Sequence, residues 1–493
     1  MIKLLDCTLR DGGYYTNWDF DKNLVREYLN YIEKLPIEYI EIGYRSKLKD
    51  EYFGEYFYLP FNTIEFIKNN TSKKLSIMLN VKDCLDIDLK ELLDDIKEDI
   101  DIIRLAIDPN KIEDGLNVAK TLKEAGFKVG FNLMYISKIE DNHKIYKYLK
   151  EIEKYGDILY LVDSYGAIFP NSLEKLIQNI QKSISLPLGF HGHNNLELAF
   201  SNTLVAIKNG IEYIDSTILG MGRGAGNLKT ELFLTYLKTN NNFDVDLNIL
   251  SKLVELFKPL QDKYKWGTNF AYIVSGSYSL PQKDVMEALE INRYSITSII
   301  NKLTNNFDNL PVFQPIKSFE RAIIIGGGNS VKNHLEVIKL FLKQNDDILV
   351  IHSTSKYINL FEDIKNYQIF AISGDEITKL EILPSSSISV FITNPNPIKL
   401  NIKDNRFYRL KSIDFTLYND SPLSVSLEIT NLLNIKDIYL IGYDGYNETK
   451  NKKELYLMQE TQSIIDEFDK KLICLTKTNY KNIVQSSVFG MIK

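Results

Sequence analysis

The chain has 493 residues, of which 44% are hydrophobic and 25% charged, and its 59 basic and 65 acidic side chains give a net charge of −6. This is an ordinary globular composition with length for two to four domains, and without a basic block it excludes nucleic-acid binding driven by bulk electrostatics. Small-molecule partners are therefore expected. Three scattered cysteines, Cys7, Cys84 and Cys474, exclude a disulfide framework and a CxxC-type zinc site. The N-terminus shows no apolar leader and no run of eighteen apolar residues occurs, so we expect a cytoplasmic protein without membrane contact.

The first 240 residues alternate short apolar runs with amphipathic segments of helical spacing. The predicted strands are residues 2–6, 39–43, 75–79, 102–106, 128–133, 158–162, 188–191 and 213–217. Eight strand–helix units fit the usual size of a (β/α)8 TIM barrel, about 250 residues, with an open doubly wound sheet as the alternative. Polar residues that follow the strands would then share one mouth of the barrel. These are Arg10, Asp11, Glu41, Arg45, Arg104, Asn132, Asp163, Ser164, His191, His193 and Asp215.

The first of these polar segments reads LLDCTLRDGGYY, residues 4–15. We expect the first strand to hand over to a polar turn that carries Arg10 and Asp11 and is closed by Gly12 and Gly13, where a missing Cβ allows close approach of backbone or ligand. Adjacent arginine and aspartate at a strand end can hold an anion and a metal together. A surface ion pair in a tight turn is the alternative.

The seventh strand ends in GFHGHNN, residues 189–195. Histidines two residues apart on an extended segment point to the same side, so His191 and His193 can reach one divalent ion; hydrogen bonds to neighbouring loops are the alternative. The glycine-rich loop LGMGRGAGNLKTE, residues 219–231, adds Asn227, although such a loop can also hold phosphate. Together with Asp11 these nitrogen and oxygen ligands suit Mn²⁺ or Mg²⁺, and the imidazoles favour Mn²⁺.

Six motifs occur in order between residues 8 and 227: TLRDGG, IEIGYRS, FNLMY, VDSYG, HGHNN and GMGRGAGN. They resemble the DRE-TIM metallolyases, which are HMG-CoA lyase-like, and most of all the 4-hydroxy-2-oxovalerate aldolase branch, over roughly the first 310 residues. The resemblance implies a divalent-metal-dependent aldolase or lyase that makes or breaks a carbon–carbon bond next to a 2-oxo acid such as pyruvate, with an aldehyde as second substrate.

The resemblance also implies roles for single residues. Asp11, His191 and His193 would bind the metal, joined by Asn227 as in some members, while Arg10 would stabilise the enolate oxygen and Glu41 would lie beside it. The substrate-binding residues expected at the mouth are Arg104, Asn132, Ser164 and Tyr278, with Tyr272 as the alternative to Tyr278.

One position departs from the family pattern. The bacterial aldolases place a histidine, the base that takes the 4-hydroxyl proton, three residues after the motif aspartate, and this chain has Tyr14 there. A phenol with an ordinary pKa of about 10 is a poor base at neutral pH. Tyr14 therefore acts with a lowered pKa or through a water, or packs over the mouth while the reaction differs. Claisen condensation of an acyl-CoA, and a scaffold protein whose barrel has lost its chemistry, are the alternatives.

The remaining chain reads as a helical extension, residues 241–312, that caps the barrel (1–240), followed by a smaller Rossmann-like doubly wound α/β domain at 320–493. The missing GxGxxG pattern argues against a nicotinamide site. GGGNS and IYLIGYDGY faintly resemble sialyltransferase-like and pterin-diphosphokinase-like proteins. This resemblance implies a nucleotide or nucleotide-sugar site that serves surface-carbohydrate metabolism within a multifunctional protein. The alternative is a domain without catalytic activity. The sequence leaves open whether the protein is a homo-oligomer. Its expected contacts are Gly326, Gly328, Asn329, Ser330 and Asp444.

Overall fold

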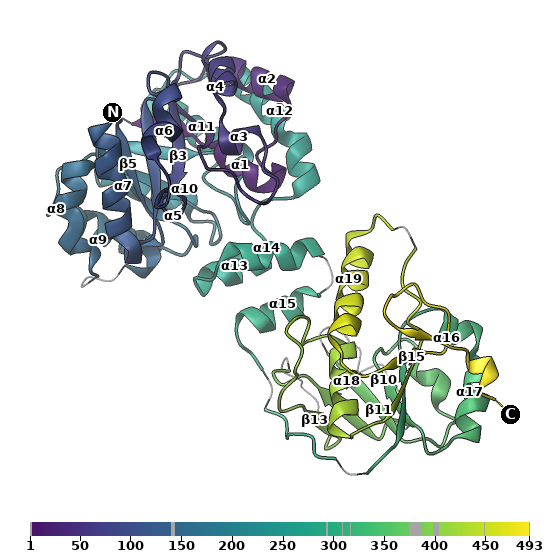
Figure 1. Ribbon diagram of the computed structural model, residues 1–493. Helices are drawn as coiled ribbons and strands as arrows, with labels where there is room; N and C mark the ends of the chain where they lie inside the picture. Colours follow the sequence, from purple (N-terminus) through teal and green to yellow (C-terminus); the bar gives the residue numbers. More distant parts are fainter. Residues whose placement is uncertain are drawn as a thin grey trace. The chain divides into compact units, whose positions relative to one another are not determined.

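The computed structural model describes residues 2–139, 143–291, 294–307, 309–315, 317–373, 387–397, 404–447 and 449–492. The chain divides into two compact units, Met1–Met286 and Glu287–Lys493, drawn in purple to teal and in green to yellow in Figure 1. The division falls inside the segment 241–312 that the sequence predicts as one helical extension. Within the described ranges, no helix combines the length and the apolar character that crossing a membrane requires.

The first unit is built on a closed parallel barrel, as predicted. Its strands are β1 (Lys3–Asp6), β2 (Tyr39–Tyr44), β3 (Lys74–Asn80), β4 (Ile102–Ile107), β5 (Val129–Leu133), β6 (Ile158–Asp163), β7 (Leu188–Gly192) and β8 (Tyr213–Ser216). Each strand pairs with the next, and β8 pairs in parallel with β1 from Lys3↔Tyr213 to Asp6↔Ser216. This last pairing closes the barrel and excludes the open-sheet alternative.

Helices surround the strands of this unit. They are α1 (Thr8–Thr16), α2 (Lys22–Ile32), α3 (Glu55–Tyr58), α4 (Phe61–Lys68), α5 (Val81–Cys84), α6 (Leu89–Leu93), α7 (Ile112–Glu124), α8 (Ile145–Tyr155), α9 (Pro170–Gln181), α10 (Ala199–Lys208), α11 (Thr230–Asn241), α12 (Leu247–Tyr264) and α13 (Phe270–Ser277). Three further helices follow the barrel helices into the second unit: α14 (Gln282–Ile291), which spans the division, α15 (Ile296–Leu303) and then α16 (Ser330–Asn333).

The barrel strands are buried on both faces, which is why they read as continuous apolar runs. Every residue of β2, β6 and β7 is buried. One face of each strand packs against the helices in a large core. The other face fills the barrel interior with a smaller cluster that includes Leu5, Tyr160 and Tyr213. Above this apolar layer, at the carboxyl ends of the strands, the buried residues become polar and charged.

The second unit contains a parallel sheet of eight strands in the order β13-β12-β11-β10-β9-β14-β15-β16. The strands are β9 (Arg321–Ile325), β10 (Leu349–His352), β11 (Gln368–Ile372), β12 (Val390–Thr393), β13 (Phe407–Arg409), β14 (Asp437–Ile441), β15 (Leu472–Cys474) and β16 (Val484–Gln485). The main helices are α17 (Leu335–Gln344), α18 (Pro422–Leu432) and α19 (Lys452–Glu467). Successive residues of β9 enter two different cores, one with α18 and α19 and one with α17. Helices therefore cover both faces, as a doubly wound sheet requires.

A histidine in this sheet gives the second unit a specific pH dependence. His352 ends β10, is fully buried, and donates from Nε2 to Gln368 Oε1 at 2.8 Å. Burial lowers its pKa from 6.5 to about 4. Between these values the unfolded chain binds a proton that the folded unit excludes, so the free energy of unfolding falls as the pH falls, by about 3 kcal/mol.

This dependence is measurable in the full chain because Cys474 is buried in β15, whereas the other cysteines belong to the first unit. We expect the urea midpoint for labelling of Cys474 by dithiodipyridine, a reagent that also reacts with thiols in acid, to decrease from pH 7 to pH 4, as followed by peptide mass spectrometry. The decrease should be smaller in His352→Gln, which keeps a donor for Gln368. Equal decreases in both proteins would show that His352 does not cause the effect.

Candidate metal centre at the barrel mouth

The RDGG segment is helical. The prediction of a polar turn is wrong, because β1 ends at Asp6 and α1 begins two residues later, at Thr8. The buried Asp6 carboxylate starts this helix by accepting the Thr8 N–H at 3.0 Å. Gly12 and Gly13 serve packing: a Cβ on Gly12 would lie 2.6 Å from the sulfur of Met221, and one on Gly13 would lie 2.2 Å from the Trp18 ring. The glycines thus let these side chains close over the helix.

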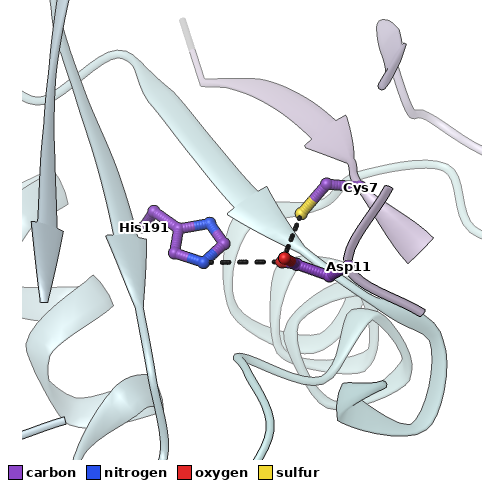
Figure 2. Close-up of side chains that lie close together, drawn as sticks. All are labelled: Cys7, Asp11 and His191. Carbon is purple, nitrogen blue, oxygen red and sulfur yellow. Dashed lines mark hydrogen bonds and ion pairs between the residues drawn. The ribbon is translucent and has the colours of Figure 1, made fainter. Parts of the chain in front are cut away.

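Asp11 is the centre of a buried polar cluster (Figure 2). Its Oδ2 atom lies 3.6 Å from both Cys7 Sγ and His191 Nε2, and it accepts the Asn227 side-chain N–H at 2.6 Å. Burial acts to raise the Asp11 pKa, but the neighbouring Arg10, with smaller effects of the two histidines and Arg223, holds that pKa below its ordinary value. Asp11 is therefore an anion at neutral pH.

Hydrogen bonds fix the orientation of both histidines. His191 donates from Nδ1 to Asp215 Oδ2 at 2.9 Å, and His193 donates from Nδ1 to the Asp163 carbonyl oxygen at 2.8 Å. Burial, followed by the effect of His191, lowers the His193 pKa to about 3, so this ring is neutral at physiological pH. With Nδ1 occupied, Nε2 is the nitrogen that each ring can offer to a metal, which is the usual arrangement of metal-binding histidines.

The donor set fits a divalent ion. Asn227 pairs with His193 in an isolated β-bridge, and its buried Oδ1 has no hydrogen-bond partner in the described part of the chain. A cation beside the anionic carboxylate and the two imidazoles would satisfy this buried oxygen, so the residues present fit a divalent metal. Cys7 lies close by, but burial raises its thiol pKa well above the ordinary value, so it is a neutral hydrogen-bond donor to Asp11.

A chain of buried charges supports this cluster from below. Glu41 accepts Arg10 Nε at 2.7 Å and an Arg104 N–H at 3.1 Å. Arg10 also pairs with Asp11, and Arg104 pairs with Asp215, the hydrogen-bond acceptor of His191. Arg104 and Glu41 have no exposed surface, and the Arg104 guanidinium carbon lies 3.9 Å from the centre of the Tyr160 ring. Alternating charges thus connect Arg10 to His191 through the barrel interior.

Tyr14, which replaces the histidine of the family pattern, lies on the same helix as Asp11. Its hydroxyl is 2.9 Å from the Tyr44 hydroxyl, and its ring packs edge-on against Trp18. The guanidinium carbon of Arg223 lies 4.3 Å from the centre of the Tyr14 ring. The pKa of Arg223 is raised, first of all by Tyr14. Arg223 makes no ion pair with any residue that the structure describes.

The other predicted substrate contacts are dispersed. Asn132 is buried and accepts Arg104 Nε at 3.0 Å, and Ser164 Oγ accepts the Tyr135 N–H at 3.0 Å. Tyr278 follows α13 and is 58% exposed, whereas Tyr272 is buried and its ring lies against Gly224 of the glycine-rich loop. Among the tyrosines after the barrel, the structure therefore brings Tyr272 to this loop.

The predicted nucleotide contacts gather where the strand order reverses, at the ends of β9 and β14. Asp444 accepts the Ser330 N–H at 2.9 Å and also binds the Ser330 hydroxyl. A Cβ on Gly328 would lie 2.5 Å from the Asp444 carboxyl carbon. Asn329 Oδ1 accepts Lys356 Nζ at 3.3 Å. The carboxylate of Asp444 thus occupies the Ser330 N–H, so a bound phosphate would have to displace it.

Sequence reasoning assigned no role to Asp163, Asp215 or Arg223. Both aspartates lie at strand ends, but their function depends on the histidine nitrogen with which each one forms a hydrogen bond. Arg223 lies inside GMGRGAGN, a motif in which the glycines and Asn227 are the residues that the sequence assigns to ligand or metal binding. The sequence feature that could have identified Arg223 is the presence of a single arginine in a loop of small residues.

Comparisons with known proteins show which families and folds the chain is similar to. Residues 103–257 match the HMGL-like family. A 4-hydroxy-2-oxovalerate aldolase of Carboxydothermus hydrogenoformans is 30% identical over 263 residues, which are 52% of this chain and 76% of that protein. The crystallised N-terminal domain of a putative aldolase from Bacteroides vulgatus is 46% identical, with a TM-score of 0.58, over 61% of this chain and all of that domain. Pyruvate carboxylase of Rhizobium etli shares the fold, at 15% identity and a TM-score of 0.50, over 62% of this chain and 33% of that protein.

Proposed function

Because the chain belongs to the 4-hydroxy-2-oxovalerate aldolase group of the HMGL-like family, we propose that its barrel is a divalent-metal-dependent lyase that makes or breaks a carbon–carbon bond of a 2-oxo acid through a pyruvate-type enolate. The observation that carries the proposal is the set of groups around Asp11. It combines an anionic carboxylate, two histidines held with Nε2 available, an unsatisfied amide oxygen and a buried arginine.

Asp11, His191, His193 and Asn227 would hold Mn²⁺ or Mg²⁺, and the two imidazoles favour Mn²⁺. Such an ion, when bound, supplies positive charge beside the oxygens of the 2-oxo acid. Arg10 adds a second positive charge: Glu41 and Asp11 fix its guanidinium, and its remaining N–H groups can donate to the keto oxygen as negative charge develops there. Glu41 acts by positioning Arg10.

The proton of the 4-hydroxyl group needs an acceptor in cleavage and a donor in condensation. We assign this exchange to the Tyr14 hydroxyl, which Tyr44 orients and Arg223 approaches from the ring face.

The proposal is tested by supplying 4-hydroxy-2-oxovalerate to the full chain with Mn²⁺ and measuring pyruvate. A parallel reaction contains acetyl-CoA and a 2-oxo acid and is assayed for free thiol. Metal-dependent release of pyruvate without release of thiol is expected. Thiol release without cleavage would replace the aldolase assignment by a Claisen condensation.

Tyr14→Phe tests the assignment of the proton exchange. Loss of a general acid or base costs about 100-fold or more, so we expect kcat for cleavage to fall by about 100-fold, while deuterium exchange into the pyruvate methyl group falls less than about tenfold. Tyr44→Phe removes only the orienting hydroxyl and should have the smaller effect on kcat. Cleavage by Tyr14→Phe at the wild-type rate would show that another group moves this proton.

A further inference from the structure

A cavity opens on the side of the barrel where the strands end, the side that also carries the candidate metal centre. Its volume is about 310 Å³, and it opens among the segments that follow β4, β5 and β6. The residues that line it are Asp108, Pro109, Asn110, Tyr135, Lys138, Ile139, His143 and Tyr165. None of them is needed to hold the metal or the enolate, so the proposed function leaves this cavity without a role.

The lining has two aromatic faces and several hydrogen-bonding groups. The rings of Tyr135 and Tyr165 lie 5.0 Å apart, centre to centre. Tyr135 has a left-handed backbone with φ of 59°, a conformation that a bulky residue rarely adopts, and its N–H is held by Ser164. The side chains of Asp108, Asn110 and His143 supply polar atoms. Such a mixture suits a hydroxylated carbon chain, whose C–H groups meet rings and whose hydroxyls meet polar atoms.

The lining of this cavity contains one cation that can pair with an anionic ligand. Lys138 Nζ lies 4.6 Å from the centre of the Tyr165 ring and, counting only described residues, has no carboxylate partner. The one acidic group of the lining, Asp108, uses Oδ1 to cap the short turn that follows it, by accepting the Asn110 N–H at 2.8 Å. Among the described residues, Lys138 is therefore available to pair with a negative group of a ligand.

Arg223 is a cation near this cavity. Its guanidinium carbon lies 4.3 Å from the centre of the Tyr14 ring, and its charge acts to lower the pKa of Tyr135, a residue of the cavity lining. Tyr135 in turn contacts Tyr165. Arg223 is therefore a second cation without a carboxylate partner in the described chain, and it lies against Tyr14, the residue proposed to exchange the proton.

We propose that the cavity is the binding site for the aldehyde substrate, and that this aldehyde is a hydroxylated, sugar-like chain with an anionic group, recognised by Lys138 and Arg223. The inference rests on the proposed function. The volume equals that of about ten water molecules in the liquid, far more than acetaldehyde, the aldehyde produced from 4-hydroxy-2-oxovalerate, would fill. In the condensation, C3 of pyruvate loses a proton and forms the new bond to the aldehyde carbon, whose oxygen takes up a proton.

The test measures condensation of pyruvate with two matched pairs of aldehydes in the Mn²⁺-loaded full chain. One pair is D-erythrose 4-phosphate and D-erythrose, and the other is D-glucuronate and D-glucose. We expect kcat/KM to be at least about tenfold higher for the anionic member of one pair, and the pair that responds distinguishes phosphate from carboxylate. Lys138→Gln and Arg223→Gln should each reduce this ratio about tenfold, the effect of one charged hydrogen bond. Lys120→Gln, an exposed change on α7, is the matched control.

Two additional measurements distinguish failure of this inference from failure of the proposed function. Deuterium exchange into the pyruvate methyl group needs no aldehyde, so exchange without any preference for anionic aldehydes would overturn the inference and keep the proposed function. Absence of exchange would overturn the proposed function. In that case the inference is tested by the binding of erythritol 4-phosphate, which cannot react. Its saturation-transfer NMR signal should be weaker with Lys138→Gln than with the wild type. Equal signals in wild type, Lys138→Gln and Arg223→Gln would contradict it.

Discussion

Asp11→Asn should eliminate metal binding and enolisation together. The substitution removes the only negative charge among the four proposed ligands, and it places an amide where Cys7 and Asn227 both donate hydrogen bonds. Loss of a partner that merely orients a metal ligand costs about 10- to 100-fold in affinity, so loss of the charged ligand itself should cost at least about 100-fold. We expect Mn²⁺ affinity, measured by electron paramagnetic resonance titration, and methyl exchange of pyruvate each to fall by that factor or more.

Two controls make this result specific. Asp262→Asn makes the same chemical change on the exposed surface of α12 and should bind Mn²⁺ as the wild type does. His191→Ala removes a second proposed ligand and should reproduce the loss. The tryptophan fluorescence of Asp11→Asn should remain native, because Trp18 packs on α1 through contacts that the substitution preserves. Wild-type Mn²⁺ affinity in Asp11→Asn would show that the metal lies elsewhere.

Arg104→Met should destabilise the barrel by about 3 to 5 kcal/mol, the usual cost of removing one partner from a buried ion pair. Arg104 has no exposed surface and neutralises Glu41 and Asp215, which are equally buried. Methionine has a similar length but leaves Asp215 without its arginine and Glu41 with Arg10 as its one remaining ion-pair partner among the described residues. Because both tryptophans of the chain, Trp18 and Trp266, belong to the first unit, urea unfolding followed by tryptophan fluorescence reports on the barrel within the full protein.

A surface control and a charge-removal variant separate the effect of charge from that of packing. Arg26→Met, on the exposed face of α2, should change the free energy of unfolding by less than about 0.5 kcal/mol. Adding Asp215→Asn to Arg104→Met removes the uncompensated charge and should recover part of the lost stability. If the double variant is less stable than Arg104→Met, packing around the arginine and not charge accounts for the cost.

The barrel was predictable because its physical signal is local. A strand covered on both faces must be apolar along its length, and the predicted strands coincide with the observed ones to within about two residues at each end. The ligand positions were suggested by the same logic, since the residues after parallel strands meet at one rim. Asp11 and His191 are indeed brought together.

The features of the site that the sequence did not predict depend on contacts between distant segments of the chain. Two adjacent glycines normally oppose a helix, and α1 forms because Trp18 and Met221 pack where side chains at Gly12 and Gly13 would stand. The choice of histidine nitrogen depends on partners 24 and 30 residues away. Arg223 meets Tyr14 only because the fold brings these two distant residues together. The spacing of residues within a motif predicts none of these contacts.

Deuterium exchange into the methyl group of pyruvate, followed by NMR, tests the central claim most directly. It needs neither the aldehyde nor the second unit's function, and it reports only on removal of the proton that creates the enolate. The account predicts exchange with added Mn²⁺, loss of exchange after chelation, and recovery when Mn²⁺ is restored. Exchange that is unaffected by chelation, or no exchange in protein shown to bind Mn²⁺, would contradict a metal-dependent pyruvate enolate at Asp11.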